Sequence, residues 1–139
     1  MRTTTDTGLL QDTLGRSITM SSSSGGGMTT NSYTVHDSDG TARHYNLNYT
    51  DAHAVYNPVE NTSQYISVLS SIDLPNSTSY TFTYAHDQGF LTRIDLPAGG
   101  YISFDYAGGN SSHNLADNYV VQRHVYDGED SWNKAGVEW

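Results

Sequence analysis

The chain has no cysteine, three prolines and a single lysine, Lys134. The absence of cysteine excludes disulfide scaffolds, zinc sites built from thiolates and cysteine nucleophiles. Lysine and arginine together number only 6 and are scattered, so no basic patch can neutralise the phosphates of a nucleic acid or an anionic membrane surface. No apolar run approaches the roughly 18 residues that a membrane helix needs. We therefore expect neither nucleic-acid binding nor membrane insertion.

The chain has few charged residues and is rich in serine, threonine, asparagine, glycine and tyrosine. The chain of 139 residues is 15% charged, contains 11 tyrosines and has a net charge of −9. Helical periodicity is nearly absent, whereas short alternating runs separated by turn residues are frequent. The sequence predicts a single all-β domain over residues 1–139, with a flexible Ser/Gly loop at 21–27. The first eight residues hold no apolar stretch, so we expect no signal peptide in this chain.

An internal repeat with an offset of 22 residues is the most informative feature of the sequence. The stretch Ile-Asp-Leu-Pro begins at Ile72 and again at Ile94, and Phe and Tyr follow at matching positions in both copies. Proline ends a strand, and Asn, Ser or Gly completes the turn. The alternation of Tyr80, Phe82 and Tyr84 places aromatic side chains on one face of the next strand. The repeat predicts an antiparallel meander of hairpins in a twisted sheet.

Three stretches of the chain carry distinct strand and turn motifs. Tyr80 to Ile94 has aromatic residues at alternate positions, then Asp and Gly, then an aliphatic strand. Asp12 to Arg16 reads Asp-x-x-Gly-Arg, and Leu96 to Tyr101 reads Leu-Pro-Ala-Gly-Gly-Tyr. These residues resemble the YD-repeat (Rhs-like) family, although the Tyr-Asp dipeptide itself occurs only at Tyr126. The resemblance covers most of residues 8–128.

The resemblance implies a strip of spirally wound sheet, a partial β-shell built from YD-like repeats of about 22 residues. In that family such sheets form large extracellular or secreted shells, and this chain is too short to close one. It shows no recognisable self-cleaving segment and no effector domain. We therefore expect a fragment of a longer secreted protein or a subunit that completes its sheet with other copies.

Four Asn-x-Ser/Thr sequons are candidate N-glycosylation sites. Three of them fall in expected turns or loops, and the first lies in an expected strand. A chain this rich in Asn, Ser and Thr also produces sequons by chance, so the alternative is unmodified surface asparagine. The candidates are Asn48, Asn61, Asn76 and Asn110.

Other candidate sites are weak. Asp37-Ser-Asp39-Gly40 resembles the start of a calcium loop but lacks the later ligands, so a hairpin turn is the better interpretation. His36 and His44 could face each other across that hairpin, but no histidine has the spacing of a metal site. No nucleophile elbow, phosphate loop or dinucleotide fingerprint is present. We predict no catalytic residue, no metal and no cofactor.

These observations favour a non-catalytic structural module of an extracellular or cell-surface protein. Open sheet edges with few charges to block them favour pairing with other copies of the chain or with neighbouring β-repeats, including filament formation. The alternative is a carbohydrate-binding module, in which tyrosines together with Trp132 and Trp139 stack on sugar rings. Against it, Tyr80, Tyr84 and Tyr106 recur where each repeat needs packing.

Overall fold

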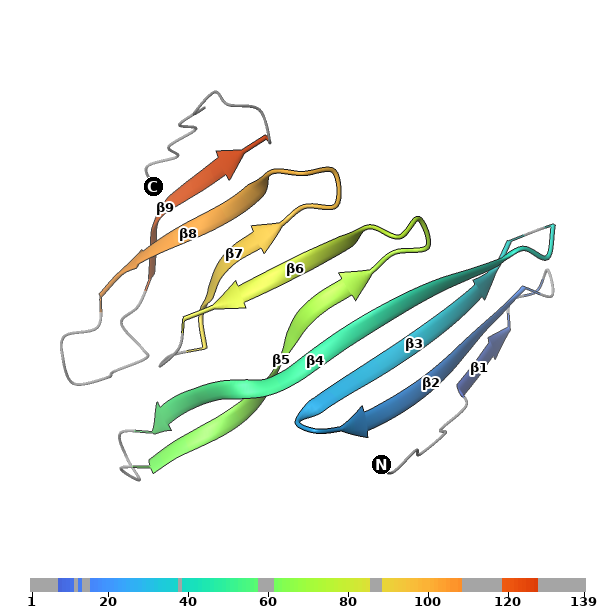
Figure 1. Ribbon diagram of the computed structural model, residues 1–139, viewed down its shortest axis with the longest axis horizontal. Coiled ribbons are helices and arrows are strands. Elements are labelled where there is room, and N and C mark those ends of the chain that lie inside the picture. The colour runs from blue at the N-terminus through green and yellow to red at the C-terminus, as the bar shows by residue number, and fades with distance from the viewer. Residues whose placement is uncertain are drawn as a thin grey trace. The chain divides into compact units, whose positions relative to one another are not determined.

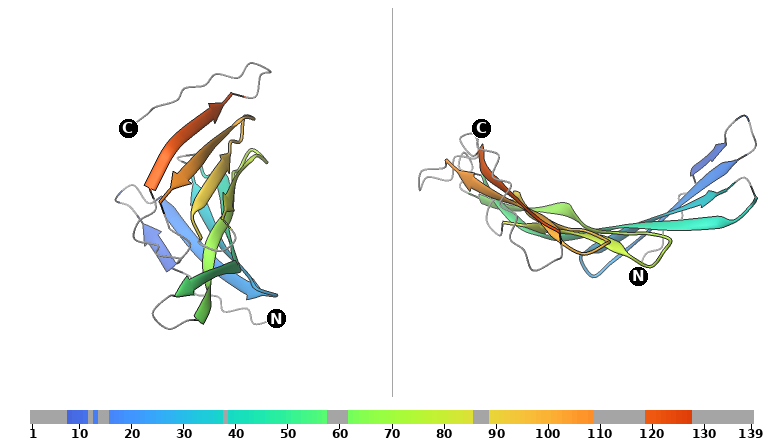
Figure 2. Two further views of the ribbon diagram at one scale, coloured as in Figure 1. Left: turned by 90° about the vertical axis from the view of Figure 1, so that its left-hand side faces the viewer. Right: turned by 90° about the horizontal axis from the view of Figure 1, so that it is seen from above.

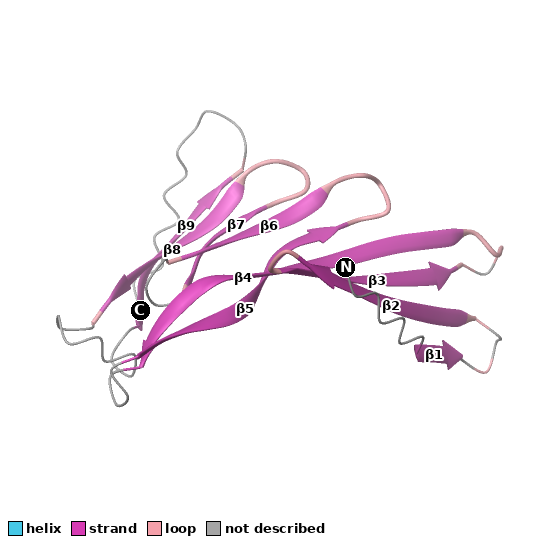
Figure 3. Ribbon diagram, turned by 60° about the horizontal axis from the view of Figure 1, so that its bottom comes forward, coloured by secondary structure: helices cyan, strands magenta, loops and turns pink. Residues whose placement is uncertain are grey.

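The computed structural model describes residues 8–11, 13, 16–37, 39–57, 62–85, 89–108 and 119–127. Within these residues the chain forms nine β-strands (Figure 1), and no segment of Figure 3 has the helix colour. Consecutive strands are neighbours in one sheet, whose order is that of the chain. The predicted all-β meander of antiparallel hairpins is confirmed. The strands are β1 (Gly8–Gln11), β2 (Ser17–Gly25), β3 (Met28–His36), β4 (Ala42–Asn57), β5 (Thr62–Asp73), β6 (Ser79–Tyr84), β7 (Leu91–Asp95), β8 (Tyr101–Ala107) and β9 (Tyr119–Tyr126).

The chain groups into two compact units. The amino-terminal unit comprises Met1–Thr50 and Leu69–Ser79, and the carboxy-terminal unit comprises Asp51–Val68 and Tyr80–Trp139. Strands β4 and β5 each contribute to both units, and β6 belongs to the carboxy-terminal unit except for Ser79. The assignment of the whole chain to one domain stays a prediction.

Strands β2, β3 and β4 of the amino-terminal unit pair in a regular antiparallel register. Met20 lies opposite Tyr33, which lies opposite Tyr45. The next set of partners is Ser21, Ser32 and Asn46. Because successive side chains of a strand point to opposite faces, this register places the aromatic residues of β3 and β4 on one face, and the other face carries mostly Ser, Thr and Asn.

The expected flexible loop at residues 21–27 is wrong. Residues 21–25 belong to β2 and pair with the start of β3, from Ser21 opposite Ser32 to Gly25 opposite Met28. Only Gly26 and Gly27 form the turn, with φ angles of 62° and 76°. Positive φ at both central residues is the geometry of a tight hairpin turn that matches strand twist. The serines therefore extend a hairpin because they pair in continuous register with the start of β3.

The carboxy-terminal unit contains β6, β7, β8 and β9, which lie side by side in one layer (Figure 2). One set of partners crosses all four strands and is entirely apolar. It consists of Phe82, Ile94, Ile102 and Val125. The sets on either side are mostly polar, so this part of the sheet also has one apolar and one polar face.

The two copies of the sequence repeat form equivalent turns. In the first, the Ser77 N–H donates to the Leu74 carbonyl, and the Leu74 N–H donates to the Thr78 carbonyl. In the second, the same pair of bonds links Gly99 to Leu96 and Leu96 to Gly100. The third loop residue has positive φ in both, 65° at Ser77 and 92° at Gly99. The predicted proline turns of the repeat are confirmed.

Replacing Ser77 by glycine is expected to stabilise the fold by about 0.5–1 kcal/mol. A residue with a Cβ in the left-handed region is strained by about 1–2 kcal/mol, and glycine removes this strain. Part of the resulting stabilisation is offset because glycine has more freedom in the unfolded chain. Urea unfolding of Ser77→Gly beside the parent protein measures this difference. The reciprocal change, Gly99→Ser, should destabilise the equivalent turn by a similar amount, and a loss of stability in Ser77→Gly would contradict the assigned turn geometry.

Candidate interaction surfaces

Asn48 is a member of a hydrogen-bonded network on the polar face of the amino-terminal unit. Its Oδ1 accepts a bond of 2.8 Å from the Thr30 hydroxyl. Its Nδ2, the atom that would carry a glycan, donates at 2.9 Å both to Ser71 Oγ and to Asp73 Oδ2. At the neighbouring position on the same face, the Ser32 hydroxyl donates to Asn46 Oδ1. The network therefore joins three strands, and a glycan on Asn48 would replace one of the two hydrogens that its Nδ2 donates.

Asn76 lies at a turn and is exposed, as its sequon predicts. Its Oδ1 accepts from the Thr78 backbone N–H at 3.3 Å and from the Thr78 hydroxyl at 2.7 Å. These bonds leave its Nδ2 out of the turn's hydrogen bonding. The candidates Asn61 and Asn110 lie outside the described residues. Asn76 is thus the sequon whose described surroundings best accommodate a glycan.

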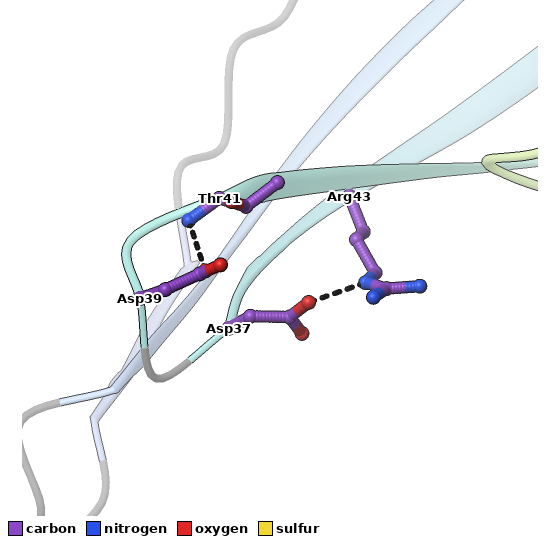
Figure 4. A network of polar contacts seen from close by, with 4 residues as sticks. All are labelled: Asp37, Asp39, Thr41 and Arg43. Carbon is purple, nitrogen blue, oxygen red and sulfur yellow. Dashed lines mark hydrogen bonds and ion pairs between the residues drawn. The ribbon is translucent and has the colours of Figure 1, made fainter.

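The acidic segment after β3 is a hairpin turn, as predicted. The Gly40 N–H donates to the Asp37 carbonyl, and Gly40 has a φ of 83°. Figure 4 shows Arg43 Nε bound to Asp37 Oδ2 at 2.6 Å, and the Thr41 N–H bound to Asp39 Oδ1 at 2.9 Å. The bonds from Thr41 hold the pKa of the Asp39 carboxyl below its usual value. Both carboxylates therefore stabilise the turn.

The possibility that His36 and His44 face each other is wrong, because the register offsets them by two residues. His36 lies opposite Ala42, and His44 lies opposite Thr34. The His44 ring nitrogen Nδ1 is 3.0 Å from the Thr34 hydroxyl. In the part of the chain that the structure describes, no three His, Cys, Asp or Glu residues gather into a group that could hold a metal ion.

The polar face of the carboxy-terminal unit carries a row of stacked side chains that sequence reasoning missed. The Arg93 guanidinium lies 3.8 Å from the centroid of the Tyr101 ring, and its Nε donates to Asp95 Oδ1 at 2.9 Å. The rings of Tyr101 and Tyr126 are 5.2 Å apart between centroids and tilted by 32°. The row crosses β7, β8 and β9 and reaches the last strand of the sheet. We refer to these four residues as the arginine–tyrosine row.

A second contact on this face joins the same pair of strands. His124 Nε2 on β9 lies 2.7 Å from Asp105 Oδ2 on β8. Asp105 is 58% exposed, so solvent screens the pair and its contribution to stability is small. The contact between His124 and Asp105 links β9 to β8 at a second position on the polar face.

The apolar face of this unit is held together by aromatic packing. The rings of Phe90 and Tyr106 stack with centroids 5.2 Å apart, and the Tyr106 hydroxyl donates to the Leu91 carbonyl at 2.7 Å. Partial burial raises the pKa of the Tyr106 phenol. Tyr106 is therefore a packing residue, which supports the interpretation that the tyrosines of the repeat fill the sheet's own surface.

Neither unit buries its apolar face. Among the described residues only Val68 is buried, at 9% exposure, and no described side chain is fully buried. The apolar set of Phe82, Ile94, Ile102 and Val125 is half-buried throughout. Antiparallel sheets ordinarily pack one face against a second layer. The described chain supplies no such layer, and this uncovered face is the feature that most needs a functional explanation.

The two tryptophans of the candidate sugar platform, Trp132 and Trp139, lie outside the described residues. Of the tyrosines in the arginine–tyrosine row, Tyr101 already contacts Arg93 and Tyr126. The described residues contain no helix long and apolar enough to cross a membrane. Comparison with known protein families, curated proteins and solved structures finds no match to this chain.

Proposed function

We propose that this chain is a non-catalytic structural module, built from YD-like β-repeats, of an extracellular or cell-surface protein. Its function is to supply a stretch of β-sheet that packs against further sheet. The partner is another copy of the chain when the module is alone, and neighbouring β-repeats when it is part of a longer polypeptide.

The uncovered apolar set on β6 to β9 carries this proposal. Four apolar side chains line up across four strands, and each is only half-buried. Burying apolar area stabilises by about 25 cal/mol per Å², so a second layer on this face would be strongly favoured. The unit's described ionic contacts, Arg93 with Asp95 and His124 with Asp105, lie on the other face, as the register of their strands requires. The apolar face itself carries a charged side chain, Arg123, which lies opposite Phe104 beside the apolar set, so a covering layer has to leave this guanidinium at its rim in water.

The assignment to the outside of a cell rests on the resemblance to YD repeats and on composition. A sheet that carries few charges and many Ser, Thr and Asn side chains stays hydrated through hydroxyl and amide groups, as in the network around Asn48. If the organism that makes the protein attaches N-glycans, Asn76 is an exposed sequon in a turn that can receive one.

Sedimentation velocity of the 139-residue protein at micromolar concentration tests the proposal. We expect species larger than a monomer whose proportion falls on dilution, because association covers the apolar face. A monodisperse monomer over the whole concentration range, with far-ultraviolet circular dichroism typical of β-sheet, would sink the proposal for the isolated chain.

A further inference from the structure

We propose that Tyr101 and Tyr126 form a site of oxidative dityrosine cross-linking, which joins the last two strands of the sheet covalently. The two residues are direct partners on β8 and β9. Their ring centroids are 5.2 Å apart, with the planes tilted by 32°. Both side chains are half-buried, so an oxidant reaches them while the fold limits their motion.

The neighbouring side chains hold the Tyr101 ring in place before any reaction. Arg93 lies over the ring at 3.8 Å, and Asp95 fixes the guanidinium through hydrogen bonds from Nε and from the terminal nitrogen. A cation over an aromatic face is attracted to the ring and restricts its rotation. The backbone register sets the separation of Tyr101 and Tyr126, since facing Cα atoms of antiparallel strands are about 4.5–5.5 Å apart. Coupling therefore needs only rotation of the side chains.

The chemistry balances with a peroxide as the oxidant. Each phenol loses one electron and one proton to give a phenoxyl radical. The two radicals form a carbon–carbon bond between ring positions ortho to the oxygens, and a proton shift on each ring restores both phenols. The two electrons and two protons released reduce one hydrogen peroxide to two water molecules, with a haem peroxidase as the catalyst. The chain itself supplies only the two positioned rings.

Other tyrosines of the same unit are placed differently. The Tyr106 hydroxyl is bound to the Leu91 carbonyl and its ring is stacked on Phe90. Tyr119 is 62% exposed at the start of β9, and Tyr65 is 76% exposed on β5. Exposed tyrosines react with oxidant but are less constrained, so they favour random coupling between chains. In a chain without cysteine, the Tyr101–Tyr126 bond would be a covalent link between strands.

Trypsin separates the two residues and so locates the bond. Cleavage after Arg93, Arg123 and Lys134 gives a peptide of residues 94–123 and a peptide of residues 124–134 whose only tyrosine is Tyr126. The dilute protein is treated with a haem peroxidase and limiting hydrogen peroxide. We expect blue dityrosine fluorescence, and a joined peptide whose mass is the sum of the two less two hydrogen atoms, with fragment ions placing the bond at Tyr101.

Three variants and two controls decide the outcome. The joined peptide should be lost in Tyr126→Phe and in Tyr101→Phe, and retained in Tyr65→Phe, which removes a more exposed tyrosine. Mixing isotope-labelled with unlabelled protein should give no mixed-label product, and reaction in denaturant should abolish the preference for this pair. The proposal is overturned if the 124–134 peptide stays free, if the joined peptide persists in Tyr101→Phe, if it carries both labels, or if denaturant leaves its yield unchanged.

Discussion

Replacing Gly100 by alanine is expected to destabilise the protein by about 3–4 kcal/mol, a large effect for a single methyl group. Gly100 has a φ of 77°, where a Cβ costs about 1–2 kcal/mol. The added Cβ would also collide with the Tyr126 carbonyl oxygen and would lie 2.9 Å from the Asp127 carbonyl carbon. Both are backbone atoms, which cannot rotate away, so the end of β9 has to separate from β8. Urea unfolding followed by circular dichroism measures the loss.

The neighbouring glycine supplies a matched control for this prediction. Gly99 has a φ of 92° in the same turn, but a Cβ there meets no atom within 4 Å. Gly99→Ala should therefore cost only about 0.5–1 kcal/mol, because the left-handed strain is partly offset by the lower freedom of alanine in the unfolded chain. The difference between the two variants measures how closely β9 approaches the turn. Equal losses in Gly99→Ala and Gly100→Ala would contradict the placement of β9 beside Gly100.

The turns of the repeat could be predicted from the sequence because turn chemistry is local. Proline after Leu74 and Leu96 fixes the first loop residue, and a short polar or glycine-rich loop follows, so both hairpins form the same hydrogen bonds. The need for a second glycine in Gly99-Gly100 could not be predicted. It arises from the approach of Tyr126, which is distant in sequence.

The serine-rich segment shows where composition misleads. Serine and glycine have low strand propensity, and residues 21–27 have the composition of a flexible linker. Propensity is overridden here because β3, which begins at Met28, pairs with every residue from Ser21 to Gly25. The side chains on that face then bind one another, as Ser32 and Thr30 do with asparagines of β4.

The interaction surfaces were predictable only in part. The short turn between β7 and β8 sets Asp95 opposite Tyr101, so the proximity of Arg93 to Tyr101 follows from loop length. The position of Tyr126 does not follow from loop length, because the connection between β8 and β9 is long and a long connection does not determine the register. The offset of His36 from His44 likewise depends on the residues of the turn, whose left-handed Gly40 shifts the pairing.

Replacing Ile102 by aspartate is expected to abolish the association of the chain with itself. Ile102 lies between Ile94 and Val125 in the middle of the apolar set. Ile102 is already half-buried in the sheet, so covering the rest of its side chain is worth about 1 kcal/mol at most, and the larger cost comes from desolvating an unpaired carboxylate at the same position, about 2 kcal/mol or more. A loss of about 2 kcal/mol or more per copy weakens association by more than about tenfold. Sedimentation velocity should show the variant as a monomer at concentrations where the parent protein is assembled.

Ser103→Asp is the control, because it places the same charge on the next residue of β8 but on the polar face. Ser103 lies opposite Arg93, so the new carboxylate has a guanidinium as its neighbour, and the change is expected to leave association within about twofold of the parent. Ile102→Thr keeps the β-branched shape and separates loss of apolar area from loss of folding. If it remains folded by circular dichroism, it should associate more weakly than the parent. Association that resists both changes at Ile102 but fails in Ser103→Asp would place the assembly interface on the polar face instead.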